Sequence, residues 1–202
     1  MSAGIGKQAK TLNKKQIEEV LETLKTSEHF RHPERETVAF LLSVRQGLRA
    51  CEIAKLTWSM VTRPDGTLDD AIHLRNRATK KMVGGRIIPL HVQTLMALAA
   101  LQLKVIGRPE DPVIQSERMK NKFMTPHSIV ILFDRLYEYM GFEGCSSHSG
   151  RRTFATRAVR AIGAAGGTIR DVQKLLGHKS LETTAVYIEN DSAAQRAVME
   201  LI

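Results

Sequence analysis

The amino-acid sequence predicts a mainly helical α+β fold with one small antiparallel sheet. Apolar residues recur at helical spacing along most of the 202-residue chain, as in helices that bury one side. Between residues 61 and 90 this period is lost, and a Pro-Asp-Gly turn at 64–66 precedes two short strand-like runs at 71–74 and 86–90. The length suits one domain, so we expect residues 1–202 to form a single unit with a hairpin between two sets of helices.

Three helices are predicted before the hairpin. Asn13 and Gln16 have the spacing of a capping box, which places the first helix at residues 14–26. Pro33 suits the first turn of the second helix, and Gly47 ends that helix. The buried side of the second helix is expected to consist of Val38, Leu41, Leu42 and Val44, with Phe40 at its margin.

The third helix is short and begins at Arg49, directly after the Gly47 turn. Ile53 and Leu56 are its inward-facing residues. The backbone N–H groups at a helix start favour anions, so an arginine at this position is a candidate phosphate ligand. A lone Gly-Leu-Arg sequence is more often an ordinary surface arginine, and it gains meaning only together with other motifs.

Five further helical segments are predicted after the hairpin. The first spans residues 91–106 and ends before Gly107, and the second begins with an N-cap and N1 pair at residues 125–126 and ends at Gly141. The third of these carries His148 and Arg151 and is capped by Ser146 or Ser147. The fourth is capped by Thr168 with Asp171 and ends at Gly177. A last amphipathic segment covers residues 191–202.

The chain is basic, with 30 lysines and arginines against 21 acidic residues and a formal charge of +9. Such an excess favours a polyanionic partner, nucleic acid first and a membrane surface second. Two cysteines, Cys51 and Cys145, suit neither a disulfide framework nor a zinc site, and no apolar run is long enough to span a membrane. We therefore expect a cytoplasmic protein that binds nucleic acid.

His148, Arg151, His178 and Tyr187 occur at defined spacings towards the C-terminal end. His148 and Arg151 are three residues apart, the spacing at which helical residues share a face. His178 follows a helix-ending glycine, and Tyr187 comes nine residues later. Singly, each has an ordinary explanation, such as a helix cap, a solvated arginine or a core tyrosine. With Arg49 they supply a nucleophile, two cations and two imidazoles for one phosphate.

These five residues lie in four short motifs. In chain order the motifs are G-L-R-x-x-E at 47–52, H-x-x-R at 148–151, L-G-H at 176–178 and T-T-x-x-Y at 183–187. This order resembles the tyrosine recombinase, or phage integrase, family, and the resemblance extends over residues 8–190. One departure is Gly150, where members often have leucine before the arginine. The resemblance implies a tyrosine recombinase-like catalytic domain.

The resemblance also implies a catalytic lysine on the hairpin, ahead of an R-x-x-P-L strand. Counting back from Pro89 favours Lys81 as this residue. The Thr-Lys pair formed with Thr79 favours Lys80 instead, so both remain candidates, with Lys81 the first choice.

The chemistry implied by the resemblance requires no metal, cofactor or ATP. Tyr187 would attack phosphorus and form a covalent 3′-phosphotyrosine, which retains the bond energy and makes the step reversible. Arg49 and Arg151 would hold the non-bridging oxygens with their planar forks. The hairpin lysine would protonate the departing 5′ oxygen. His148 would accept the tyrosine proton or bind the phosphate, and His178 would donate to a phosphate oxygen.

The implied function is that of a site-specific recombinase or integrase, encoded by a bacterium, a phage or another mobile element. Its partner would be double-stranded DNA, on which the chain would self-associate as a tetrameric synapse. No N-terminal core-binding domain is expected within these 202 residues. Residues 1–11 are expected to be mobile, and residues 191–202 to form a helix that packs in cis or docks on a neighbouring protomer.

Two alternatives remain open at the level of the sequence. One is DNA relaxation of the type IB topoisomerase kind, which shares the fold and the phosphotyrosine chemistry but needs no partner in trans. The other is a DNA-binding protein with a catalytically silent site, which the complete set of site residues disfavours.

Overall fold

The computed structural model describes residues 9–75, 78, 85–105, 107–117 and 122–188. Lys80, Lys81 and residues 191–202, on which the lysine and tail predictions fall, lie outside the described residues. The chain divides into two compact units, Met1–Phe154 and Ala155–Ile202.

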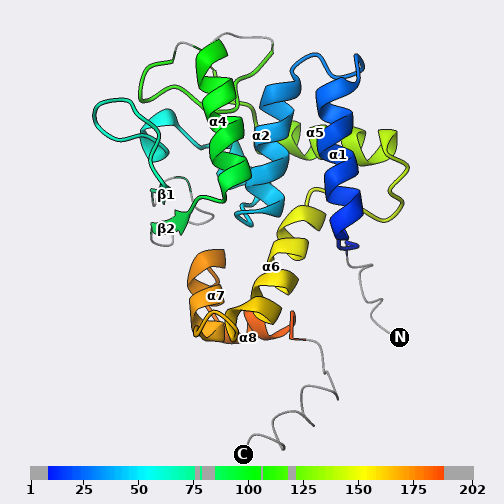
Figure 1. Ribbon diagram of the computed structural model, residues 1–202, viewed down its shortest axis with the longest axis vertical. Coiled ribbons are helices and arrows are strands. Elements are labelled where there is room, and N and C mark those ends of the chain that lie inside the picture. Colours follow the sequence, from blue (N-terminus) through cyan, green and yellow to red (C-terminus); the bar gives the residue numbers. More distant parts are fainter. Residues whose placement is uncertain (1–8, 76–77, 79–84, 106, 118–121, 189–202) are drawn as a thin grey trace, which may run out of the picture. The chain divides into compact units, whose positions relative to one another are not determined.

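The first unit is built around helix α2. Helices α1 (Lys14–Thr26) and α4 (Val92–Lys104) both pack against α2 (Pro33–Val44), as Figure 1 shows. Helix α5 (Pro126–Tyr139) packs against the short helix α3 (Ala50–Ala54). The predicted helices of this unit are thus confirmed, and α2 forms its central element.

Helix α2 is more deeply buried than its predicted amphipathic pattern requires. Every residue from 38 to 44 is buried, and a helix that is apolar on all sides is a core helix. Phe40, predicted at the margin, has 0% exposed surface, so that prediction is wrong. The cause is tertiary, because α1 and α4 both pack against α2.

Local caps set the starts of the helices. Asn13 Oδ1 accepts the Gln16 N–H at 2.8 Å, and Gln16 Oε1 accepts the Asn13 N–H at 3.0 Å, which confirms the capping box of α1. At the start of α5, Thr125 Oγ1 accepts the Ser128 N–H at 3.0 Å and Pro126 lies in the first turn. These side chains satisfy N–H groups that have no partner inside the helix.

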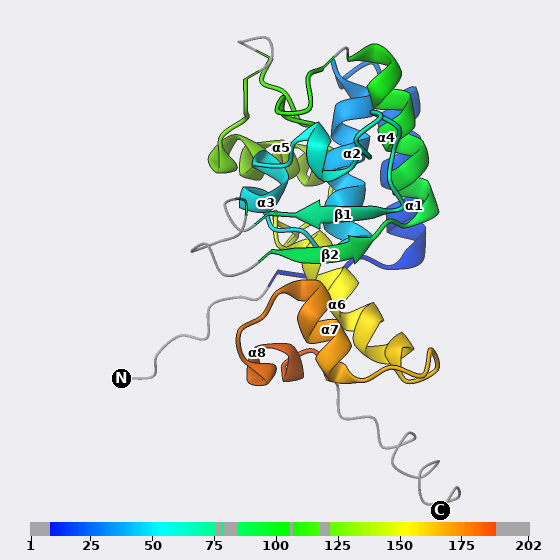
Figure 2. The same ribbon diagram turned by 90° about the vertical axis from the view of Figure 1, so that its left-hand side faces the viewer.

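The predicted hairpin is a two-stranded antiparallel sheet of β1 (Ala71–Leu74) and β2 (Arg86–Pro89), seen edge to edge in Figure 2. Ile72 is opposite Ile88, and both side chains are buried. The sheet contacts a 3₁₀ helix, η1 (Trp58–Met60), on the β1 side. The predicted sheet is confirmed, with the lysine-bearing connection between its strands.

Helix α6 (Ser149–Ile162) begins in the first unit, close to the end of α2. Gly47 has a left-handed φ of +64°, and a Cβ there would collide with the Phe154 ring. A Cβ on Gly150 would collide with Ser43 Oγ and lie 2.9 Å from Ser43 Cβ. Members of the resembled family often have leucine at this position. Here Ser43 leaves no room for a side chain, so glycine is required.

Replacement of Gly150 by leucine is expected to destabilise the protein by about 1–3 kcal/mol, the usual cost of overpacking a close contact. Thermal denaturation followed by circular dichroism measures this change. Gly163→Leu is the matched control, because nothing lies within 4 Å of a Cβ at Gly163. Equal melting temperatures for the two variants would contradict the packing assigned to Gly150.

A segment before α1 is hydrogen-bonded to the region where α6 begins. The Lys10 N–H donates to the Gly144 carbonyl at 3.0 Å, and the Leu12 N–H donates to Thr153 Oγ1 at 2.8 Å. Arg152 Nη1 donates to the carbonyl of Ala9 at 3.0 Å. The Leu12 side chain is buried. Residues 9–12 are therefore packed as part of the first unit.

The second unit contains the rest of α6 together with α7 (Ile169–Leu176) and α8 (Leu181–Ala185), which pack against each other. Asp171 Oδ2 accepts the Thr168 N–H at 2.9 Å, so the predicted cap of α7 is confirmed. Gly177 closes α7 with a left-handed φ of +61°, also as predicted.

Candidate active site

Arg49 occupies the N-cap position of α3, as the glycine turn predicted. Its backbone N–H donates to Glu52 Oε2 at 2.9 Å, and its Nη1 donates to Glu52 Oε1 at 3.0 Å. Glu52 thus binds both the backbone and the guanidinium of Arg49. A carboxylate three residues after the N-cap is the second half of a capping box, and here it also orients the arginine side chain.

Glu52 is a buried carboxylate surrounded by arginines, with a side-chain exposure of 0%. Arg86 Nη1 and Nη2 donate to its two oxygens at 2.9 and 3.0 Å. Burial raises the pKa of Glu52, but the hydrogen bonds and charge of Arg86, and then of Arg49, outweigh burial and lower that pKa below its ordinary value. Glu52 is therefore ionised at neutral pH.

The start of α6 supplies His148 and Arg151. The Ser146 N–H donates to Ser149 Oγ at 3.0 Å, and the His148 N–H donates to Ser146 Oγ at 3.3 Å. Ser146, one of the two predicted caps, thus bonds to residues at the start of α6, but His148 lies one residue before α6 and not within it. Its carbonyl accepts the Arg152 N–H at 2.9 Å, and its side chain is exposed.

Arg151 is buried beside the same carboxylate. Its exposed fraction is 6%, its Nη1 donates to the Gly47 carbonyl, and this nitrogen lies 3.9 Å from Glu52 Oε2. Arg49 and Arg151 are 102 positions apart in the sequence, yet both adjoin Glu52. The first unit therefore brings together the two arginines that the sequence predicted as phosphate ligands.

The second unit brings His178 and Tyr187 together. His178 follows Gly177, and its Nδ1 lies 2.9 Å from Thr184 Oγ1, within hydrogen-bonding distance. The Tyr187 ring stacks on the His178 ring, with centroids 6.2 Å apart and planes inclined by 13°. Thr184 is fully buried in α8, so it fixes the imidazole against a rigid element.

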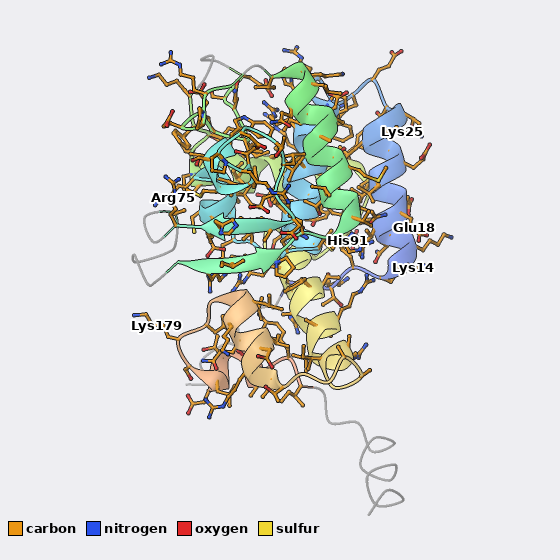
Figure 3. The ribbon with its side chains drawn as sticks, turned by 60° about the vertical axis from the view of Figure 1, so that its left-hand side comes forward. Lys14, Glu18, Lys25, Arg75, His91 and Lys179 are labelled. Atoms are coloured by element: carbon orange, nitrogen blue, oxygen red, sulfur yellow. The ribbon has the colours of Figure 1, made fainter. Side chains whose placement is uncertain are left out.

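Two surface cations flank these groups, one in each unit. In Figure 3, Arg75 stands where β1 ends, at the start of the connection that contains Lys80 and Lys81. In the second unit, Lys179 follows His178 and points outward from the turn between α7 and α8. Both side chains are available to a polyanion at the surface of their own unit.

Two residues of this site were missed at the level of sequence. Glu52 is part of the G-L-R-x-x-E motif, and its spacing of three from Arg49 was the available signal. Arg86 opens the R-x-x-P-L strand, but nothing local shows that its side chain reaches Glu52, 34 positions earlier.

In the described part of the chain, no three His, Cys, Asp or Glu side chains are grouped to hold a metal ion. No helix among those residues is long and apolar enough to cross a membrane.

Residues 10–194 match the model of the phage integrase family. The tyrosine recombinase XerC of Rhizobium meliloti (strain 1021) is 31% identical over 154 residues, which are 73% of this chain and 43% of XerC. The chain therefore spans less than half the length of this relative.

Two solved structures have a similar fold. The XerH site-specific recombinase, in a pre-cleavage complex with its difH substrate, gives a TM-score of 0.72 at 19% identity over 98% of this chain and 55% of that chain. A lambda integrase dimer bound to a COC' core site gives a TM-score of 0.65 at 20% identity over 94% and 51% of the two chains. Since the family model matches nearly the whole sequence, the protein belongs to the phage integrase family and carries a tyrosine recombinase catalytic domain.

Proposed function

We propose that this protein cleaves and rejoins double-stranded DNA at specific sites through a 3′-phosphotyrosine at Tyr187, with no metal or ATP. The observation that carries the proposal is the grouping of Arg49 and Arg151 around Glu52 in one unit, and of His178 against Tyr187 in the other. Family membership and the formal charge of +9 support it further.

In the proposed cleavage step, the phenolic oxygen of Tyr187 attacks phosphorus and its proton passes to His148. The bond from phosphorus to the 5′ oxygen breaks as Lys81, or alternatively Lys80, gives a proton to that oxygen. A second 5′ hydroxyl reverses the step and releases the tyrosine. Each positioned acid or base contributes about 10²- to 10⁴-fold to the rate.

Arg49, Arg151 and His178 stabilise the charge that develops on the non-bridging oxygens. Phosphoryl transfer depends mainly on such positioning and charge stabilisation. The bonds from Glu52 to Arg49 hold this guanidinium before DNA arrives, so less ordering is required during the reaction.

The proposed partners are double-stranded DNA and further copies of this chain in a tetrameric synapse. The structures of XerH bound to its difH substrate and of a lambda integrase dimer bound to a core site support DNA binding and assembly of more than one copy. We also propose that residues 191–202 dock on a neighbouring protomer, and that the protein acts in the cytoplasm on bacterial or phage DNA.

Covalent capture tests the proposal without knowledge of the target sequence. A library of nicked duplexes with randomised sequence is mixed with the protein, and adducts that resist denaturation are isolated and sequenced. A nick beside the cleavage point lets the short 5′ product diffuse away, so the adduct accumulates. The expected result is a single enriched sequence, the captured duplex. An absence of adducts with well-folded protein would leave only the silent DNA-binding alternative.

A supercoiled plasmid that carries the captured sequence separates recombination from relaxation. Exchange between two such sites, with concentration-dependent assembly, supports the recombinase. Relaxation by a monomer, without exchange, would support the topoisomerase-like alternative.

Affinity for the captured duplex is expected to fall steeply with salt, because counterions are released from each neutralised phosphate. For roughly 6–10 phosphate contacts, the loss between about 50 and 200 mM salt is about 10³-fold or more. Fluorescence anisotropy on a labelled duplex measures this dependence. A nearly flat dependence would indicate a partner other than a nucleic acid.

A further inference from the structure

We infer that Arg86 is a positioning residue for strand cleavage, which acts through Glu52 to fix the guanidinium groups of Arg49 and Arg151. The inference rests on the proposed function and adds a residue that has no assigned role in it. Arg86 lies at the start of β2, directly after the connection that contains Lys80 and Lys81.

The geometry at Glu52 is that of a shared anchor. Arg86 uses both terminal nitrogens on the two carboxylate oxygens, at 2.9 and 3.0 Å. Arg49 approaches from the start of α3 with its backbone and its side chain, and Arg151 approaches from α6 with a nitrogen at 3.9 Å. One carboxylate therefore joins β2, α3 and α6, and among the described residues three arginines lie within 4.0 Å of it.

The balance of charge gives Arg86 its role. Counted over the described residues, three guanidinium groups of +1 each and one carboxylate of −1 leave a net charge of +2 around Glu52. Arg86 neutralises the carboxylate with a parallel pair of charge-assisted hydrogen bonds, the strongest geometry for this pair. The positive charge of Arg49 and Arg151 is then left for a phosphate, and their positions are set by an anchor that stays ionised.

Arg86 differs from the two phosphate-ligand candidates in its orientation. Its fork is directed at Glu52, and its side chain is only 10% exposed, against 24% for Arg49. Arg151 Nη1 lies 3.9 Å from the carboxylate and donates to the Gly47 carbonyl. Arg86 therefore acts through Glu52, and its removal should change the rate of cleavage more than the affinity for DNA.

The test compares Arg86→Met and Arg86→Lys with the wild-type chain on the captured duplex. At saturating DNA, Arg86→Met is expected to cleave about 10²-fold more slowly, the scale of an effect caused by misplaced groups. Its DNA affinity should stay within about threefold, since the lost guanidinium is bonded to Glu52 through both terminal nitrogens. Arg86→Lys should not restore the rate, because an ammonium group cannot bind both oxygens in parallel.

Arg35→Met is the matched control. Arg35 is also buried, and its Nη2 bonds Glu36 and Glu117 at 3.2 and 2.7 Å. It lies at the opposite end of α2 from the Gly47 turn, about 14 Å away along the helix. Its removal should lower the melting temperature in the same way but leave the cleavage rate per folded molecule unchanged. Equal rates for Arg35→Met and Arg86→Met would reduce Arg86 to a structural role and overturn the inference.

The pH profile provides a readout that lost stability alone would not change. Without Arg86, the largest contribution that lowers the pKa of Glu52 is lost while burial of the carboxyl group remains, so this pKa should rise. A protonated Glu52 no longer holds Arg49, so the cleavage rate of Arg86→Met should fall as pH falls through this raised pKa. The wild type and Glu52→Gln should lack this ionisation. A wild-type profile for Arg86→Met would contradict the inference.

The double variant Glu52→Gln/Arg86→Met covers the case in which Arg86→Met does not fold, because it contains no unpaired buried carboxylate. If Arg86 acts through Glu52, the double variant should cleave at the rate of Glu52→Gln alone. A further decrease of about tenfold or more in the rate constant would show that Arg86 acts independently of Glu52 and would overturn the inference.

A carbon-13 NMR titration of the Glu52 carboxyl group separates this inference from the proposed function. The wild-type carboxyl group should titrate below its ordinary range, and that of Arg86→Met at a higher pH than in the wild type. This result requires no cleavage, so a protein that formed no adducts would still report whether Arg86 controls the anchor. An unchanged titration in Arg86→Met would overturn the inference even in an active enzyme.

Discussion

Replacement of Tyr187 by phenylalanine is expected to abolish covalent adducts with the captured duplex, a loss of at least about 10⁴-fold. The substitution removes the attacking oxygen and no charge. The ring that stacks on His178 is retained, so the second unit should keep its packing. DNA affinity should therefore remain nearly unchanged, as measured by anisotropy beside the gel assay for adducts.

The other two tyrosines of the chain provide the comparison for this experiment. Tyr139 is exposed, its hydroxyl lies 3.1 Å from Ser27 Oγ, and Tyr139→Phe should form adducts at the wild-type rate. Tyr137 is buried among aromatic rings, and burial raises the pKa of its phenol, so it is poorly placed to attack DNA. Adducts that persist in Tyr187→Phe would show that the nucleophile is another residue.

Lys81→Ala is expected to slow cleavage by about 10²- to 10⁴-fold, because the departing 5′ oxygen would leave without a proton. A captured duplex with a 5′-phosphorothiolate at the cleavage point should restore the rate, since sulfur leaves without protonation. Single-turnover cleavage on the two substrates gives the ratio directly.

Arg49→Ala is the control for that rescue. Its defect is in charge stabilisation and not in the leaving group, so the sulfur substrate should leave it slow. If Lys80→Ala is rescued and Lys81→Ala is not, the general acid is Lys80. Rescue of neither variant would remove the hairpin lysine from the proposed mechanism.

The sequence predicted the elements whose determinants are local. The caps of α1, α5 and α7 are hydrogen bonds between residues three positions apart, so the residue types and their spacing contain the answer. The hairpin was equally accessible, because its strands interrupt a helical period.

Other features depend on long-range packing and could not be predicted in this way. Phe40 is fully buried because α2 has helices on more than one side, which no periodicity in α2 itself reveals. The bond between Arg86 and Glu52 joins a strand to a helix through the tertiary fold. His148 lies one residue before α6, where its N–H donates to Ser146 Oγ.

The packing of residues 9–12 determines where the catalytic unit begins in the sequence. A boundary taken from the helices alone would begin at Asn13 and discard the Leu12 side chain, whose burial is worth about 1.5–3 kcal/mol. It would also remove the partners of Thr153 and Arg152, which follow Arg151 on α6. The cooperative unit therefore begins before its first helix, and a cut there would weaken the part of α6 that carries Arg151.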